Sequence, residues 1–132
     1  MLVVAAIIER EGRFLICQRR KGRPFPMKWE FPGGKVRPDE APEAALIREL
    51  EEELGVRATV AGEFCRTSYQ YPEMPEPVEL IFFRVNLGEQ PPRNLAFEQI
   101  VWAEPRALPH YDFLEADREM VARMAARETE PE

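Results

Sequence analysis

The sequence lacks a long apolar run: the longest, residues 2–8, has seven members. A helix that crosses a membrane needs about 20 apolar residues, so no membrane span is predicted. No positively charged segment precedes the run, as one does in a signal peptide. Cysteine is scarce as well. Cys17 and Cys65 both lie in apolar or strand-like stretches, and we expect reduced core thiols of a cytoplasmic protein rather than a disulfide.

Positive charge and histidine are also in short supply. The chain has 18 Lys and Arg against 24 Asp and Glu, which gives a formal net charge of −6. Proteins that bind nucleic acids draw most of their phosphate affinity from clustered Lys and Arg, so stable nucleic-acid binding is not expected. A phosphate-bearing ligand would need a local arginine or a bound cation. The one histidine, His110, has no partner near it in the sequence and is expected in a surface loop.

The composition is sufficient for one compact domain. A chain of 132 residues is too short for two ordinary domains, and 45% apolar and 10% aromatic residues can fill a core. No internal repeat is visible, and only residues 128–132 form a biased polar segment. We expect a single domain over residues 1–127, followed by a frayed tail, in a protein that is a monomer or a homodimer.

Hydrophobic patterning predicts more strands than helices. Strands are expected at residues 2–8, 13–19, 29–31, 57–69, 78–87 and 100–102. Helices are expected at residues 40–54 and 115–127. Asp39 is the expected N-cap of the first helix and Gly55 its C-terminal cap, whereas Gly33 and Gly34 are expected to stop the third strand. This pattern indicates the α+β class, with helices covering a mixed sheet.

The first predicted helix carries two distinct faces. The apolar face, which is expected to point into the core, holds Leu46, Ile47, Leu50 and Leu54. The acidic face holds Glu49, Glu52 and Glu53, because spacings of three and four place side chains side by side. Three neighbouring carboxylates repel one another unless the patch is well solvated or a hard cation bridges it.

A solvated acidic face is the simpler interpretation of such a triplet, but its surroundings favour a metal site. Arg48 precedes the triplet and can hold the carboxylates in orientation by hydrogen bonds. Residues 31–34 bring a bare backbone turn close to the start of the helix. Carbonyl and carboxylate oxygens are the ligands that hard divalent cations prefer, so the sequence predicts such a cation here.

Residues 34–56 read G-x5-E-x7-REL-x-EE-x-GV, which resembles the Nudix box at every position. Residues 29–35 and 116–117 are similar to the MutT branch of that family, close to its CTP pyrophosphohydrolases and 8-oxo-dGTP diphosphatases. The resemblance implies a Nudix fold, an αβα sandwich around a mixed sheet. It also implies hydrolysis of a nucleoside diphosphate linked to another moiety, with Mg²⁺ or Mn²⁺ as cofactor.

The resemblance assigns roles around the acidic face. It implies a cation held by the Gly33 carbonyl and by Glu49, Glu52 and Glu53. Arg48 would orient these carboxylates, Glu40 would tie the loop to the helix, and Gly34 and Gly55 would be structural. Either Glu52 or Glu53 would be the base or would position the attacking water. Relatives often carry a further acidic residue about six positions before the tryptophan matched by Trp102; this chain has Ala96 there, and Glu98 is the candidate replacement.

The resemblance also predicts the substrate contacts. Arg19 would bind phosphates, with Arg20 or Arg23 as substitutes, and Gly34 and Lys35 would lie beside them. The Phe31 backbone, Tyr71 as a stacking platform and Asp117 as the reader of the base edge would bind the nucleobase. The alternatives are a surface arginine at Arg19, a sheet-edge tyrosine at Tyr71 and a plain helix N-terminal carboxylate at Asp117. The turn at residues 73–77 is about two residues longer than in MutT and carries no arginine.

Asp117 bears on which base is preferred. An ionised aspartate only accepts hydrogen bonds and favours an edge with N–H groups, such as the amine of cytosine or adenine. A protonated one also donates, which keeps oxidised guanine open.

The sequence therefore predicts a Mg²⁺-dependent pyrophosphohydrolase of (deoxy)nucleoside triphosphates that acts on a small-molecule nucleotide. Hydrolysis of another conjugate, such as ADP-ribose, is the alternative within enzymes, and RNA 5′-end hydrolysis lacks a basic stripe to support it. An inactive nucleotide-binding module is the alternative from another class, although the box retains all its carboxylates.

Overall fold

The computed structural model describes residues 1–127, and the predicted tail, residues 128–132, lies outside the described residues. The strands are β1 (Leu2–Arg10), β2 (Arg13–Gln18), β3 (Trp29–Glu30), β4 (Gly33–Lys35), β5 (Thr59–Tyr69), β6 (Val78–Asn86) and β7 (Gln99–Ala103). The helices are α1 (Pro42–Leu54) and α2 (Arg118–Arg127), with 3-10 turns η1 (Pro105–His110) and η2 (Glu115–Asp117). Neither α1 nor α2 has the length and apolar character of a membrane span.

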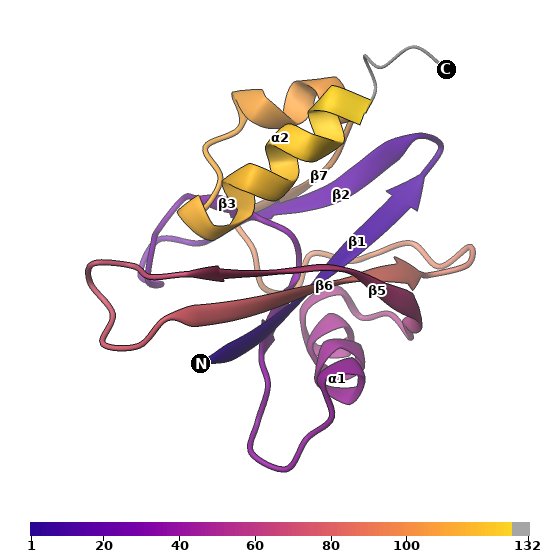
Figure 1. Ribbon diagram of the computed structural model, residues 1–132. Coiled ribbons are helices and arrows are strands. Elements are labelled where there is room, and N and C mark those ends of the chain that lie inside the picture. Colours follow the sequence, from indigo (N-terminus) through magenta and orange to yellow (C-terminus); the bar gives the residue numbers. More distant parts are fainter. Residues whose placement is uncertain (128–132) are drawn as a thin grey trace.

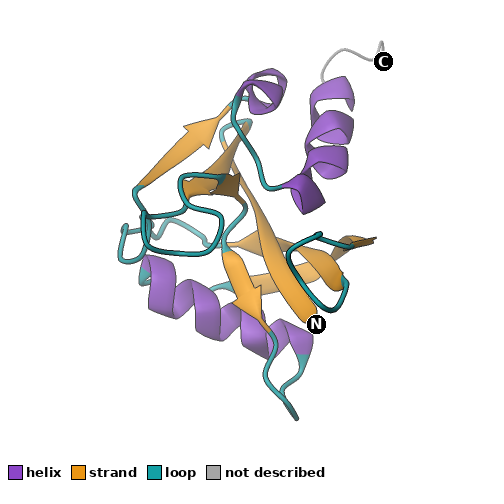
Figure 2. Cartoon of the chain, turned by 90° about the vertical axis from the view of Figure 1, so that its left-hand side faces the viewer, coloured by secondary structure: helices purple, strands orange, loops and turns teal. Residues whose placement is uncertain are grey.

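The strands form a mixed sheet with β1 at its centre. β1 runs parallel to β6 and antiparallel to β2 and β4, and the order across the sheet is β3-β2-β1-β6-β5. β7 adds to β2, and β4 pairs with β1. In Figure 1, α1 and α2 lie on opposite sides of the strands, and the view in Figure 2 shows the same three layers from the side. The αβα sandwich and the α+β class are confirmed.

Alternation along the strands divides the core into two layers. In β1, Val4, Ala6 and Ile8 face α1, while Ala5 and Ile7 face α2. The α1 side contributes Leu46, Leu50 and Leu54 to the core, and the α2 side contributes Met120, Val121 and Met124. A strand buried on both faces reads as a continuous apolar run, which explains residues 2–8.

The ends of α1 differ in how well the sequence predicted them. Gly55 ends the helix as predicted, with φ of 64° and its N–H donating to the Glu51 carbonyl at 3.0 Å. The predicted N-cap is wrong: the helix begins at Pro42 after Ala41, without a side-chain cap, and Asp39 has φ of 65°. Proline suits the first helical position because its missing N–H would have no helical partner there.

The predicted buried face of α1 is one residue too wide. Leu46, Leu50 and Leu54 are fully buried, whereas Ile47 is 38% exposed. Ile47 lies on the outer face of the helix, in a shallow hollow that it shares with Arg48.

The glycine pair continues the sheet instead of ending a strand. Gly33 pairs with Ala5 and Gly34 with Val4 of β1. A Cβ on Gly33 would overlap the Val4 carbonyl oxygen, so glycine is required by the close approach of two backbones. Three other predictions differ from the structure in detail. The last predicted helix divides into η2 and α2, and the strand predicted from residue 57 begins at Thr59. His110 is exposed, but it lies at the end of η1 rather than in a loop.

Candidate active site

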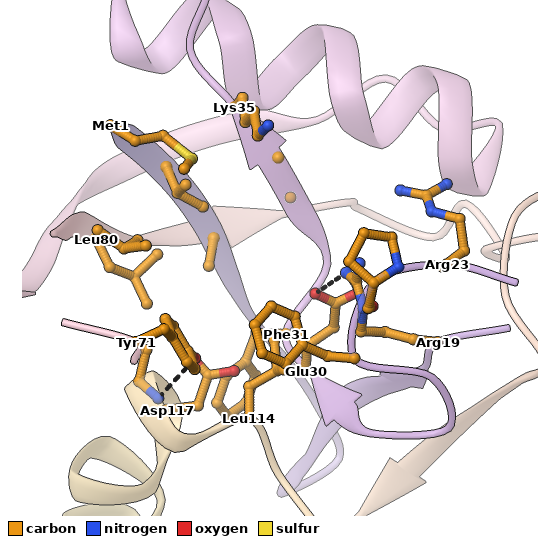
Figure 3. A pocket seen from close by; sticks show the side chains of 18 of the residues that line it. Met1, Arg19, Arg23, Glu30, Phe31, Lys35, Tyr71, Leu80, Leu114 and Asp117 are labelled. Atoms are coloured by element: carbon orange, nitrogen blue, oxygen red, sulfur yellow. Dashed lines mark hydrogen bonds and ion pairs between the residues drawn. The ribbon is translucent and has the colours of Figure 1, made fainter. Parts of the chain in front are cut away.

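A cavity of about 930 Å³ opens beside β4 and extends to η2. Its two ends differ in chemistry. One end holds the carboxylates of Glu49 and Glu53 beside Gly33 and Gly34. The other is mostly apolar, with Asp117 and Glu73 as its acidic residues, and its walls include Phe25, Phe31, Tyr71, Met74, Leu80 and Leu114. Figure 3 shows Arg19 and Glu30 facing each other between these ends, with Tyr71 and Asp117 close together.

Glu53 is the electrostatically strained group of the acidic end. Its Oε1 atom is buried without a hydrogen-bond partner in the described part of the chain. Burial raises the pKa of Glu53 to about 9, and the negative charges of Glu30 and Glu49 contribute, whereas a hydrogen bond from the Gly33 backbone opposes the shift. Two carboxylates in a poorly solvated site favour the neutral form of one of them.

Arg48 links the loop before α1 to the carboxylates on the helix. Its guanidinium donates to both oxygens of Glu40, each at 2.9 Å, and to Glu49 Oε1 at 3.0 Å. Glu40 also accepts from the backbone N–H of Arg37 at 3.1 Å. The hydrogen bonds from Arg48 and Arg37 lower the pKa of Glu40 to about 2. These contacts are the ones that the predicted roles of Arg48 and Glu40 require.

Gly34 makes room for one of the carboxylates. The side chain of Glu49 lies against the Gly34 backbone, and a Cβ on that glycine would come within 2.6 Å of Glu49 Oε1. The absent side chain therefore forms a cradle for a carboxylate that also accepts from Arg48. Glu49 is held in place from two sides.

The structure brings two of the predicted metal carboxylates into the cavity and leaves two residues outside. Glu52 is 54% exposed and lies 3.5 Å from Arg48 on the outer side of α1. Glu98 is exposed and does not line the cavity. Within residues 1–127, no three His, Cys, Asp or Glu side chains lie close enough to hold an ion together. The metal roles of Glu52 and Glu98 stay predictions.

Glu49 and Glu53 nevertheless fit a hard divalent cation. Mg²⁺ in enzymes typically takes one or two carboxylates and completes its shell with water and substrate phosphates. A cation at this end would give Glu53 Oε1 a partner and offset the repulsion that raises the Glu53 pKa. Gly33, whose carbonyl is the further predicted ligand, lies on the same wall.

Arg19 is not a free surface arginine. Its Nη1 contacts both oxygens of Glu30 at 3.1 Å, and its Nε donates to the Pro24 carbonyl at 2.7 Å. Its side chain is 16% exposed and lines the cavity. Arg23 and the exposed Lys35 also line it, whereas Arg20 donates to the Phe97 carbonyl and lies outside.

Two of the predicted base contacts come together at η2. Asp117 is 4% exposed, and burial, followed by the charge of Glu30, raises its pKa well above the usual range, with Arg19 opposing. It is therefore a buried acid rather than a solvated helix-end carboxylate. The Tyr71 hydroxyl accepts from the Ala116 N–H at 3.0 Å, so Tyr71 anchors the turn that carries Asp117. Phe31, the third predicted contact, is buried against Phe113.

Glu30 and Phe25 are among the residues of this cavity that sequence reasoning missed. Glu30 stood in the motif at residues 29–35, but the sequence did not indicate that Arg19 would pair with it. Phe25 lies in a loop rich in Gly and Pro, where an isolated aromatic side chain is the only signal.

Comparison with known proteins agrees with this geometry. A family model described as the NUDIX domain matches residues 1–124. The chain is 39% identical to the CTP pyrophosphohydrolase of Escherichia coli over 98% of its length and 95% of that protein. It is 37% identical to the 8-oxo-dGTP diphosphatase of Haemophilus influenzae, over 92% of its length and 89% of that protein.

A solved structure gives the same result in three dimensions. The solution structure of the Escherichia coli ORF135 protein superposes with a TM-score of 0.82 at 36% identity, covering 98% of this chain and 92% of the other. The family model, the box at residues 34–56 and the αβα sandwich all agree, and the chain belongs to the NUDIX family.

Proposed function

We propose that the protein hydrolyses (deoxy)nucleoside triphosphates to the monophosphate and pyrophosphate with Mg²⁺, or Mn²⁺ in its place. The observation that carries the proposal is the cavity itself. Two carboxylates, Glu49 and Glu53, lie at one end, where Glu53 Oε1 has no hydrogen-bond partner among the described residues, and a buried acid, Asp117, lies among mostly apolar walls at the other. Relatives named CTP pyrophosphohydrolase and 8-oxo-dGTP diphosphatase support it.

Glu49 and Glu53 would hold the cation, together with the Gly33 carbonyl and Glu52, which the resemblance implies as further ligands. The cation, when bound, neutralises phosphate charge and lowers the pKa of a bound water. Arg48 keeps Glu49 in position through the hydrogen bond at 3.0 Å. Glu52 or Glu53 takes the proton of the attacking water. The water oxygen bonds to phosphorus, and the phosphoanhydride bond breaks to give the monophosphate and pyrophosphate. Arg19, Arg23 and Lys35 supply positive charge along the same wall.

Asp117 offers two hydrogen-bonding groups to the base. Its raised pKa favours the neutral acid, which offers one O–H donor beside one carbonyl acceptor. This pair complements an edge on which an exocyclic amine adjoins a ring nitrogen that accepts, as in cytosine and adenine. The pairing edge of guanine, where a carbonyl adjoins a ring N–H, complements the same pair with the two oxygens exchanged. We place CTP, dCTP or a modified cytosine nucleotide first among substrates because a relative that is 39% identical over 98% of this chain is named CTP pyrophosphohydrolase.

We also place the reaction in the cytoplasm, because a reducing compartment suits the free thiols of Cys17 and Cys65.

The test is product analysis with Mg²⁺ across CTP, dCTP, 5-methyl-dCTP, ATP, GTP, dGTP, 8-oxo-dGTP and ADP-ribose. Release of pyrophosphate with cytosine nucleotides ranked first is the expected result. AMP from ADP-ribose without triphosphate turnover would replace the proposal with a conjugate hydrolase. Turnover that survives Glu53→Gln at saturating Mg²⁺ would contradict the metal site.

A further inference from the structure

Three aromatic side chains line the apolar end of the cavity, but Phe31 is 3% exposed and packs against Phe82 and Phe113, which leaves Tyr71 and Phe25 for a nucleobase. If the acidic end holds the cation and phosphates, the base lies at the apolar end near Asp117. A base stacked on an aromatic ring is held much more tightly than one without such a platform. Which of the two rings presents a free face therefore decides how the base is held.

Tyr71 has almost no face left for a ligand. It is 6% exposed. Phe25 covers it with ring centroids 4.8 Å apart, and the Tyr69 ring meets it edge-on at 4.7 Å. Its hydroxyl oxygen accepts a hydrogen bond from the Ala116 N–H. A base inserted between Phe25 and Tyr71 would need about 7 Å between the rings, which is twice the carbon–carbon contact distance of about 3.5 Å.

Phe25 is the less buried ring of the pair and lies in the cavity wall. It sits in the loop between β2 and β3, where Phe25 and Met27 have φ of 52° and 65° on either side of Pro26. Bulky side chains rarely adopt such a conformation unless their surroundings hold it. Arg19 helps to stabilise this loop conformation, because its Nε donates to the Pro24 carbonyl and its backbone carbonyl accepts from the Met27 N–H at 2.9 Å.

We propose that Phe25 is the ring on which the nucleobase stacks, and that Tyr71 is a positioning residue that backs Phe25 and holds the turn bearing Asp117. This assignment rests on the proposed function, since it needs a substrate with a base. It replaces the expectation that Tyr71 itself is the stacking platform.

The experiment compares Phe25→Leu, Phe25→Tyr and Lys21→Ala on dCTP and on 2-deoxyribose 5-triphosphate, which lacks the base. Phe25→Leu keeps an apolar side chain but removes the flat ring, so the KM for dCTP is expected to rise roughly 5- to 100-fold with kcat within about twofold. Phe25→Tyr keeps the ring and restores the wild-type KM. Lys21, an exposed residue of the same loop outside the cavity, controls for loop disturbance.

The base-free substrate separates stacking from a general loss of structure. Its KM is expected to be the same in the wild type and in Phe25→Leu. An unchanged KM for dCTP in Phe25→Leu, or an equal rise for both substrates, overturns the assignment.

A second measurement keeps the assignment testable if no triphosphate is hydrolysed and the proposed function fails. Calorimetric titration with CMP, AMP and ribose 5-phosphate then compares the wild type with Phe25→Leu. Binding of a monophosphate that the leucine variant weakens at least fivefold, with ribose 5-phosphate unaffected, supports Phe25 as the platform. Equal affinities in the two proteins, or no binding of either nucleotide to the wild type, overturn it.

Discussion

The carboxylate of Glu49 lies against the backbone of Gly34, so closely that a Cβ on Gly34 would be 2.6 Å from Glu49 Oε1 and 2.7 Å from Oε2. Two motif residues 15 positions apart thus form one feature: the glycine leaves a space and the glutamate fills it. Arg48 contacts the same carboxylate at 3.0 Å. The orientation of Glu49 therefore depends on the shape of β4 as well as on charge.

Gly34→Ala is expected to remove most activity while the fold persists. The added methyl group forces the Glu49 side chain away from the cavity, and a displacement of about 1 Å at a catalytic group can cost about 100-fold in rate. The measurements are kcat with Mg²⁺ and the far-UV circular dichroism spectrum. Wild-type turnover in a folded Gly34→Ala protein would show that the position of Glu49 is unimportant.

Without a cation, the stability of the protein should fall as the pH rises from about 4.5 to about 9. The pKa of Glu53 is about 9 in the fold against an ordinary value of 4.5, so over this range the unfolded chain loses a proton that the fold retains. Loss of that proton by the unfolded state alone favours unfolding. Thermal unfolding in EDTA from pH 5 to pH 9 is the measurement. Glu53→Gln should flatten the slope, and Mg²⁺ should raise Tm in the wild type more than in the variant.

Glu53→Gln and Glu52→Gln together show which of the two carboxylates acts as metal ligand and which as base. Both variants are predicted to fold and to lose most activity, by about 100-fold or more if each group acts as ligand or base. Glu52 is 54% exposed and outside the cavity, so its loss of activity would require that it turn toward the cation. Titration of Mg²⁺ against rate separates weaker metal binding from slower chemistry. Full activity of Glu52→Gln would remove Glu52 from the site.

Asp117→Asn is expected to shift preference from cytosine toward oxidised guanine. The amide NH2 of asparagine donates at every pH and suits the carbonyls of oxidised guanine, whereas the buried acid donates only while it is protonated. The measurement is the ratio of kcat/KM for dCTP and 8-oxo-dGTP in the purified proteins. An unchanged ratio would exclude Asp117 from base recognition.

Glu30→Gln should loosen Arg19 and raise the KM for triphosphates about tenfold. The carboxylate holds the guanidinium at 3.1 Å on both oxygens, and a partly buried charged pair loses more than a surface pair when one partner becomes neutral. A double-mutant cycle with Arg19→Lys is the measurement: if the two residues act together, their effects are not additive. Additive effects would mean that Arg19 and Glu30 contribute separately.

Local patterns predicted the parts of the fold that depend on neighbours in sequence. Spacing along α1 identified the buried Leu46, Leu50 and Leu54, and Gly55 was recognisable as a left-handed cap. Features set by distant residues were missed. Gly33 extends a strand because Val4 of β1 lies against it, and no local pattern contains that contact.

The same distinction between local and distant contacts explains which parts of the site the sequence could predict. The motif identified Arg48, Glu49 and Glu53 because their relation is fixed by helical spacing and by a short loop. The pairing of Arg19 with Glu30 and the contact of Phe25 with Tyr71 join separate segments, 46 residues apart in the second case. Such contacts follow from the folded topology alone.

Helix α1 serves the hydrophobic core and the chemistry at once, since Leu50 is fully buried on one side while Glu49 and Glu53 line the cavity on another. Repacking beneath Leu50 would rotate or shift the helix and move both carboxylates with it. Anyone who wishes to make this enzyme more heat-resistant should therefore leave the inner face of α1 unchanged. Met120 and Met124 of α2 do not line the cavity, but they pack in one cluster with Phe31 and Tyr71, which do, so improved packing there must leave the apolar walls of the cavity in place.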